Sequence, residues 1–472
     1  MTDRSPSAGA ARALHAHEVQ ELATWEREEG LFDYRLGGIP LWRLIRSRYI
    51  GAYLSRAGVR GLDNYNRPQL ASLGRFLAGV GRSLLHALRL QRYRHLVIGF
   101  ARRRLEGDVW VDTFFDPLID LMGPADTLCI ERPFVGRHFR PARTRHLMYY
   151  DWVKALAITA GRCFSWLPAL RADASIDALA RIVAAKAGVA PKSVRRSLLR
   201  SYTEFLVERQ CARFVTARVA PRTLLLINRD INQGLIAACR ERGVKVYELQ
   251  HGVMHVNGYK QGTRYDERID PHGFLTFGEC WNRFDWGVPK DAVRVLGYRY
   301  IWQQRERQRR SGQPRGDAVM LVSEPGCWQE LTRPFSEIVA RHPDRQFILK
   351  LHPQDVGNWP SRYPAGLAKN VTVADDPSAD LYDLFGACRA VVGYGSTVLY
   401  EASFFGLKVC LLNEDGTNPS EAVRYVGSYN FYEYARPEDF DRMLESDRTD
   451  ESMDGNPFFA AFDAAEFRGL LE

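Results

Sequence analysis

The sequence predicts an α/β protein built from two successive doubly wound units. Short apolar runs alternate with helical segments along most of the 472 residues, and several of these runs are apolar at every position. Strands of that kind are typical of a parallel sheet covered by helices on both faces. The alternation stops at an Arg- and Gln-rich segment with Gly312 and Pro314, and then starts again. We therefore expect a basic helical segment at 1–92, a first unit at 93–302, a linker at 303–316 and a second unit at 317–472, with a cleft between the two units.

The N-terminal segment is predicted to be helical. Residues 17–29 are polar and helix-prone, residues 39–56 mix apolar and Arg side chains, and apolar residues recur at steps of three or four from Leu70 to Leu88. Arg75, Arg82 and Arg89 recur on the opposite side, which predicts an amphipathic helix with a basic stripe. Two interpretations are open. The helix packs on the body with its Arg face in solvent, or it lies on an anionic membrane surface.

The positive charge of the chain is concentrated in the same segment. The net charge is +9, and residues 1–104 alone hold 18 Arg and 8 acidic residues, so the remainder is close to neutral. A nucleic-acid-binding protein more often spreads positive charge over its main domain, so we do not expect nucleic acid as a partner.

The sequence shows no sign of export or of membrane insertion. Residues 1–20 lack the apolar core of a signal peptide, and no run of apolar residues is long enough to span a bilayer. The eight cysteines are scattered without a CxxC pair, as expected of reduced thiols. We expect a cytoplasmic protein, with peripheral attachment to the inner membrane as an open alternative.

The first unit contains short strand candidates around a long helical stretch at 174–219 and a helix at 231–242. The strands are expected at 95–100, 109–112, 127–130, 146–149, 222–228, 245–249, 274–277 and 293–296. The second unit repeats the pattern with helices at 328–341, 380–387 and 398–405. Its strands are expected at 318–322, 347–351, 371–373, 390–393 and 408–412. Ligands of such sheets bind beyond the carboxyl ends of the strands, so side chains at those positions are the candidates for chemistry.

One candidate is the run from Gly393 to Thr397, which joins a strand to a helix. The N-terminus of a helix offers free N–H groups to a phosphate. Gly395 permits close approach, and the hydroxyls of Ser396 and Thr397 add donors. Glu401 lies one helical turn later on the same side and could accept from ribose hydroxyls. The alternative is that Ser396 or Thr397 only caps the helix.

A second candidate is His352, which stands at the end of the strand that contains Lys350. Pro353 ends the ladder of hydrogen bonds, so His352 is expected at the edge of the cleft, where it could donate to a phosphate. An ordinary histidine at a strand end is the alternative, and the spacing by itself favours it.

A third set of candidates lies in the first unit. His251 follows a strand and suits a general base, and Gly252 allows an unusual backbone angle beside it. Asp230 follows the preceding strand, where it is either a base or nucleophile or, as we favour, the cap of the next helix. Asp439 and Asp441 form a DxD pattern that we interpret as a helix cap and not as a metal site.

Together these motifs resemble those of bacterial GT-B glycosyltransferases of surface-polysaccharide assembly, over roughly residues 222–412. His352-Pro353 with Ser396-Thr397 is similar to the HP and Ser/Thr motifs of bacterial sialyltransferases and of the β-Kdo transferases of capsule synthesis. His251-Gly252 resembles the HG motif of CDP-alditol polymerases. Two departures are present. The acidic-acidic-Gly runs at Glu28 and Glu414 are not in the place where sialyltransferases have theirs, and Leu249 and Gln250 replace the tryptophan of the alditol polymerases.

The resemblance implies a GT-B-like, metal-independent glycosyltransferase with two Rossmann-like domains. It implies a nucleotide-sugar donor, CMP-linked, and a glycan or lipid-linked acceptor of capsule or lipopolysaccharide synthesis. His352, Pro353, Lys350, Gly395, Ser396, Thr397 and Glu401 would hold the nucleotide, and His251 or Asp230 would act on the acceptor or the anomeric carbon. The alternatives are transfer of an alditol phosphate from a CDP donor, and a non-catalytic scaffold of polysaccharide assembly.

Overall fold

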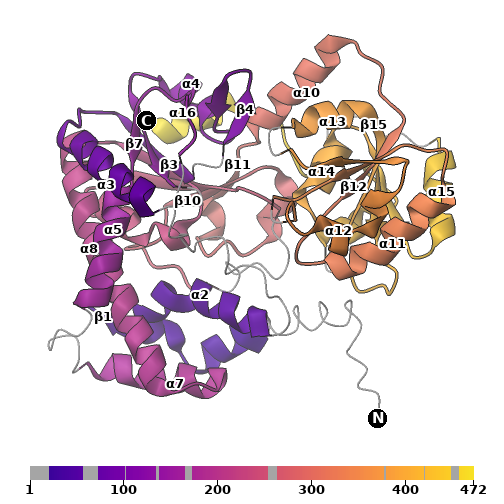
Figure 1. The fold of residues 1–472 in the computed structure, drawn as a ribbon. Helices are drawn as coiled ribbons and strands as arrows, with labels where there is room; N and C mark the ends of the chain where they lie inside the picture. The colour runs from indigo at the N-terminus through magenta and orange to yellow at the C-terminus, as the bar shows by residue number, and fades with distance from the viewer. Residues whose placement is uncertain are drawn as a thin grey trace.

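The structure is a computed structural model of the chain. It describes residues 21–56, 73–100, 103–133, 138–164, 173–253, 263–353, 355–376, 379–418, 420–447 and 456–472. Two parallel sheets, each covered by helices, form two domains that lie side by side (Figure 1). The predicted α/β fold with two doubly wound units is confirmed.

The first sheet has seven strands, all parallel, in the order β11-β10-β9-β8-β3-β6-β7. The strands are β3 (His95–Phe100), β6 (Thr127–Arg132), β7 (Leu147–Tyr149), β8 (Thr223–Leu226), β9 (Lys245–Leu249), β10 (Gly273–Thr276) and β11 (Val293–Val295). The chain builds outward from β3 on one side and then from β8 on the other. The strand order therefore reverses between β3 and β8, where ligands of such sheets bind.

The second sheet has six parallel strands in the order β14-β13-β12-β15-β16-β17. The strands are β12 (Ala318–Val322), β13 (Phe347–Lys350), β14 (Val371–Ala374), β15 (Cys388–Gly393), β16 (Lys408–Leu412) and β17 (Phe431–Tyr434). Here the order reverses between β12 and β15. The loops that carry the predicted nucleotide-binding residues follow β13 and β15.

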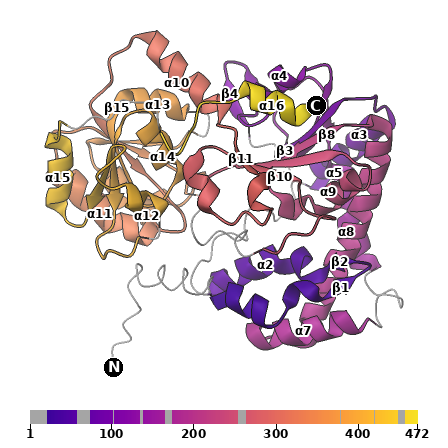
Figure 2. The ribbon, with the colours of Figure 1, turned by 180° about the vertical axis from the view of Figure 1, so that it is seen from behind.

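Helices cover both sheets and form a separate layer below the first one (Figure 1 and Figure 2). Their bounds are α2 (Leu41–Arg56), α3 (Leu73–Leu88), α4 (Asp116–Met122), α5 (Asp151–Cys163), α7 (Ala174–Ala187), α8 (Pro191–Val219), α9 (Gln233–Arg240), α10 (Arg299–Ser311), α11 (Trp328–Arg341), α12 (Trp359–Arg362), α13 (Leu381–Ala387), α14 (Thr397–Phe404), α15 (Pro437–Glu445) and α16 (Ala464–Leu471). Of the helices in these described segments, none is long and apolar enough to cross a bilayer.

The long helical stretch predicted at 174–219 is two helices. Gly188 adopts a left-handed conformation, with φ of 63°, and ends α7, and Pro191 begins α8. α7, α8 and α2 pack around one apolar core, so the N-terminal segment is not an independent extension. The predicted helix at 39–56 begins at Leu41, because the short strand β2 (Ile39–Pro40) pairs with β1 (Arg35–Leu36).

Several arginines of the basic N-terminal segment are buried in ion pairs. Arg43 pairs with Asp270 at 2.6 Å, and Arg46 pairs with Glu26 at 2.6 Å, with side chains at most 6% exposed. Burying an unpaired charge is costly, so the two arginines can be buried only because Asp270 and Glu26 neutralise them. The positive charge that the sequence concentrates here is therefore only partly available to an external partner.

The boundaries of the second domain differ from the prediction in two places. Most of the expected linker at 303–316 belongs to α10, which ends where Gly312 adopts a φ of 61°. The C-terminal α16 returns to the first sheet, where Phe467, Leu470 and Leu471 join the core of the first domain (Figure 1). These apolar side chains are buried against first-domain residues such as Val97 and Leu225.

The strand predicted at 109–112 does not enter the main sheet. β5 (Val109–Val111) pairs antiparallel with β4 (Arg104–Glu106) as a separate hairpin. This hairpin extends to the second domain, because Tyr300 of α10 donates to Glu106 at 2.6 Å and Arg104 pairs with Asp380 at 3.3 Å.

Candidate functional site

The run from Gly393 to Thr397 lies where the second sheet reverses its strand order. Ser396 is the N-cap of α14, and its Oγ accepts from the backbone N–H of Val398 at 3.3 Å. The capping role that the sequence left open for Ser396 is therefore present. Its hydroxyl proton can still be donated to a ligand, because a serine oxygen both accepts and donates.

The backbone amides that precede α14 already hold an anion, the carboxylate of Glu324. Its Oε1 accepts from the N–H groups of Tyr394, Gly395 and Ser396 at 3.0, 2.7 and 3.0 Å. The sequence predicts an anion-binding loop here, and in the structure its amides hold the carboxylate of Glu324, which the sequence analysis did not single out. Its position in the sequence could have indicated this role, because Glu324 lies two residues after the end of β12 and therefore at the same edge of the sheet.

The turn that contains His352 is held against the same edge. The backbone N–H of His352 donates to Ser323 Oγ at 2.7 Å, and Ser323 donates to the fully buried Asp355 at 2.9 Å. Arg362 and Tyr363 complete the partners of Asp355. Since Ser323 directly precedes Glu324, His352 is fixed close to the loop that leads into α14.

Lys350 is half-buried, and its Nζ donates to the carbonyl of Leu351 at 3.1 Å. Burial lowers the pKa of Lys350, and the nearby Arg104 lowers it further. Lys350 and Arg104, a residue of the other domain, therefore lie close to each other at this edge of the sheet. Pro353 is exposed at the end of the turn.

The predicted residues of the two domains meet at Thr397. The backbone N–H of Val253 donates to Thr397 Oγ1 at 3.2 Å. A Cβ on Gly252 would lie 3.7 Å from the same oxygen. The loop after β9, with the half-buried His251, therefore lies against the N-terminus of α14. The loop after β9 and the start of α14 are therefore in contact, and the joint placement of His251, His352 and Ser396 around one ligand stays a prediction.

Two local predictions about the first-domain loops are corrected. Gly252 has no left-handed backbone angle, and its loop is instead fixed by Gln250, which accepts from Phe277 N and donates to the carbonyl of Gly252, each at 2.9 Å. Asp230 does not cap α9. It lies within a short 3-10 turn, α9 begins after Asn232, and Asp230 Oδ2 is buried without a hydrogen-bond partner. Asp439 does cap α15, as predicted, by accepting from two backbone N–H groups.

Arg104 is a residue of the interdomain region that sequence reasoning counted only as charge. Its guanidinium lies 4.7 Å from the ring centre of Tyr382 and pairs with Asp380, both in the second domain. Burial lowers the pKa of Arg104. The groups around it, Tyr382, Tyr300, Asp380 and the predicted ribose ligand Glu401, favour its positive charge and raise the pKa overall. Glu401 is half-buried on α14 and therefore faces this interdomain cluster.

Asp112 is a second residue that the sequence did not single out. It follows β5, is 3% exposed, and accepts from the N–H groups of Phe114 and Phe115. Its Oδ2 would lie 3.2 Å from a Cβ on Gly99, at the end of β3, beside the reversal of strand order in the first sheet. Burial raises the pKa of Asp112 to about 6, although Arg103 opposes this shift. A carboxyl group that titrates near neutrality is typical of functional sites.

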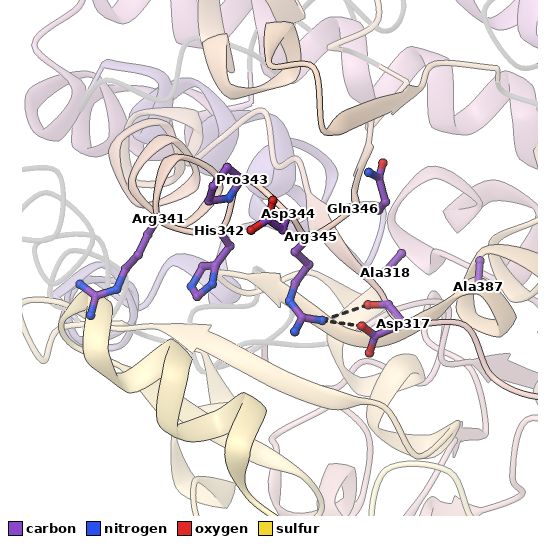
Figure 3. Close-up of a pocket in the computed structure, with 9 residues that line it drawn as sticks. All are labelled: Asp317, Ala318, Arg341, His342, Pro343, Asp344, Arg345, Gln346 and Ala387. Carbon is purple, nitrogen blue, oxygen red and sulfur yellow. Dashed lines mark hydrogen bonds and ion pairs between the residues drawn. The ribbon is translucent and has the colours of Figure 1, made fainter.

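A hollow of about 560 Å³ lies at the opposite edge of the second sheet (Figure 3). It is lined at the amino-terminal ends of β12, β13 and β15, and Arg345 there pairs with Asp317 at 2.8 Å. Ligands of doubly wound sheets bind at the carboxyl ends of the strands, and the hollow holds none of the predicted residues. We assign it no functional role.

No protein-family model and no curated protein matches this sequence. Among solved structures, UDP-GlcNAc 2-epimerase from Methanocaldococcus jannaschii matches 80% of this chain and 99% of its own, with a TM-score of 0.48 and 9% identity. The enzyme of that name from Neisseria meningitidis, bound to UDP-GlcNAc, matches 80% and 99%, with a TM-score of 0.45 and 11% identity. A variant of the wall teichoic acid polymerase TagF matches 85% and 96%, with a TM-score of 0.42 and 7% identity. At these scores the matches establish no activity for this chain.

Proposed function

We propose that the protein is a GT-B-like glycosyltransferase that uses a nucleotide sugar and needs no metal. The observation that carries this proposal is the meeting of the two domains at Thr397. The loop after β9 of one doubly wound domain touches the start of α14 in the other, so the carboxyl edges of both sheets converge. A donor held by one domain would there face an acceptor held by the other.

In this proposal the second domain holds the donor. Glu324 occupies the backbone amides before α14, so the side chains of Ser396, Thr397 and His352 are left to contact the donor phosphate. Both hydroxyls accept from backbone N–H groups and retain a proton to donate. These donors offset the negative charge that develops on the leaving nucleotide as the bond between the anomeric carbon and the phosphate oxygen breaks.

The remaining roles follow from placement. Glu401 would accept from the ribose hydroxyls, and Lys350 and Arg104 would add positive charge at the same edge. His251 would remove the proton of the acceptor hydroxyl as the new glycosidic bond forms, with Asp230, in the 3-10 turn after the neighbouring strand β8, as the alternative base. We propose a CMP-linked sugar as the donor, supported by the resemblance of the HP and Ser/Thr motifs. The acceptor would be a bacterial surface glycan or its lipid-linked precursor.

The test is a double-mutant cycle on nucleotide affinity. His352→Ala and Ser396→Ala should each weaken binding of CMP, measured by calorimetry. Their effects should not add, because groups that share one ligand couple by about 0.5–3 kcal/mol. A preceding thermal-shift comparison of CMP, CDP, UDP and GDP should select CMP.

Matched controls are His342→Ala, at the opposite edge of the same sheet, and Ser361→Ala, an exposed serine of α12. Both should leave affinity unchanged. Additive effects of the two site variants, or unchanged CMP affinity in both, would contradict a shared phosphate site. Binding of nucleotide without any sugar transfer to acceptor preparations would instead favour a non-catalytic scaffold.

A further inference from the structure

Among the described side chains of α3, small residues pack on the first domain together with Val80, whereas Leu84, Leu85 and Leu88 do not. Ser83 and Ala87 are completely buried, and a Cβ on Gly79 would lie 3.3 Å from Asp151 of α5. These three positions recur every four residues, so they form one face of the helix. Small side chains let α3 approach the body closely, and this decides which face is buried.

Three leucines in the described part of this helix consequently point outward. Leu84, Leu85 and Leu88 are 43%, 57% and 53% exposed. With about 100° of rotation per residue, Leu85 lies roughly opposite the midpoint of the buried face between Ser83 and Ala87. The interpretation in which the leucine stripe packs on the body therefore does not hold for these residues.

The exposed apolar surface continues from α3 onto two further helices. Arg218 of α8 donates to the carbonyl of Leu88 at 3.2 Å, and its guanidinium lies 4.5 Å from the ring centre of Phe214. The ring of Phe214 lies 6.5 Å from that of Trp152, and Leu156 follows Trp152 by one turn of α5. We name this surface the α3–α5–α8 face; its large exposed apolar residues are Leu84, Leu85, Leu88, Leu156 and Phe214.

The charge beside these residues is positive. The sequence contains no Asp or Glu from residue 64 to residue 105, and Arg82 and Arg89 are exposed on the side of α3 next to Leu85. Leucines at the outward pole of a helix with arginines along one flank match a bilayer interface, where apolar groups enter the acyl boundary and basic groups meet anionic headgroups. In a symmetric dimer through this face, the arginines would instead lie against their own copies.

We propose that the α3–α5–α8 face binds an anionic lipid surface, with α3 lying in its plane. The face lies at the edge of the first domain that is remote from the second domain in both views (Figure 1 and Figure 2). Binding there leaves the contact between Val253 and Thr397 untouched. The proposal stands independently of the proposed activity, because it uses none of the residues assigned to the donor or acceptor.

The experiment is co-sedimentation of the full chain with two kinds of vesicle. One is phosphatidylcholine alone, and the other is phosphatidylcholine mixed with phosphatidylglycerol. We expect clear pelleting with the anionic vesicles and much less with the neutral ones. The double variant Leu85→Glu/Leu88→Glu should lose at least about 10-fold in binding, because two buried leucines are replaced by charges. Arg82→Glu/Arg89→Glu should lose roughly 10-fold or more on anionic vesicles only.

The matched control is Leu367→Glu, since Leu367 is 67% exposed but lies in the second domain. It should pellet like the unmodified protein. Because all substituted residues are exposed, thermal unfolding should be unchanged and serves as the check on folding. The proposal is overturned if the protein pellets with neither vesicle or equally with both, or if the leucine variant pellets normally. It is also overturned if light scattering shows a dimer that the leucine variant dissolves without any binding to vesicles.

Discussion

Replacing Glu324 by Gln tests whether one carboxylate anchors the loop that begins α14. In the structure a single oxygen of Glu324 accepts three backbone hydrogen bonds, from Tyr394, Gly395 and Ser396, at 2.7–3.0 Å. A glutamine can place its amide oxygen in the same position, so the substitution removes the charge and keeps the shape. The loop should therefore be retained but held less firmly.

The magnitude follows from the charge of the acceptor. A hydrogen bond to a charged group contributes about 1.5–3 kcal/mol, against about 0.5–1.5 for a neutral pair, a loss of roughly 1 kcal/mol for each bond. The partial positive charge at the N-terminus of α14 adds about 0.3–1 kcal/mol. Because Glu324 is half-buried, solvent screening reduces the total, and we expect about 1–3 kcal/mol of destabilisation.

The assay is urea unfolding followed by tryptophan fluorescence, with Glu445→Gln, an exposed glutamate of α15, as the control. The control should unfold within about 0.5 kcal/mol of the unmodified protein. Glu324→Gln should also gain more stability from added inorganic phosphate than the unmodified protein does, since a neutral occupant competes less well for three amide donors. Equal stability of the Gln variant and the unmodified protein would refute the anchoring role.

Three further predictions concern the first domain. His251→Ala should lower turnover by about 10²–10⁴-fold while CMP binding is nearly kept; a stable, fully active variant would move the base to Asp230. The pKa of Asp112 is raised from 3.8 to about 6, so Asp112 stays protonated to a higher pH in the native state than in the unfolded state. Its contribution to the free energy of unfolding therefore decreases by up to roughly 3 kcal/mol as the pH rises from about 4 to about 6. Asp112→Asn should remove that fall, and parallel unfolding curves for variant and unmodified protein at pH 4.5 and 7 would show an ordinary carboxyl group. The pKa of His95 is lowered from 6.5 to about 4, chiefly by burial and also by Arg94, so its contribution is complete above about pH 6.5 and is lost as the pH falls to about 4. His95→Gln should therefore lessen acid destabilisation by about 2–3 kcal/mol, and an equally steep acid transition in the variant would contradict this.

The sequence by itself determined the two parallel sheets and the edges at which their polar residues gather. The runs Leu224–Leu226 within β8 and Val319–Val322 within β12 are apolar at every position, and that pattern fits a sheet that is buried on both faces. The positions of His251, His352 and Ser396 at strand ends followed as well, because parallel strands present their carboxyl ends at one edge. The cap at Asp439 was equally local, since its partners lie within four residues.

Only the tertiary structure decided which distant groups occupy those edges. Glu324 reaches amides some seventy positions along the chain, Arg104 enters the second domain from a hairpin of the first, and α16 returns across the molecule to a sheet completed long before it. Such contacts depend on how whole elements pack, and no local pattern records them.

The orientation of α3 shows the same limit within one helix. Its periodicity predicts a leucine stripe with arginines on the opposite side, and in the structure Arg82 and Arg89 are exposed on the side next to Leu85. Which stripe is buried depends on how closely the helix can approach α5, and the small residues Gly79, Ser83 and Ala87 allow the closest approach. This close approach leaves Leu84, Leu85 and Leu88 on the surface, while Val80 of the same helix packs against the core.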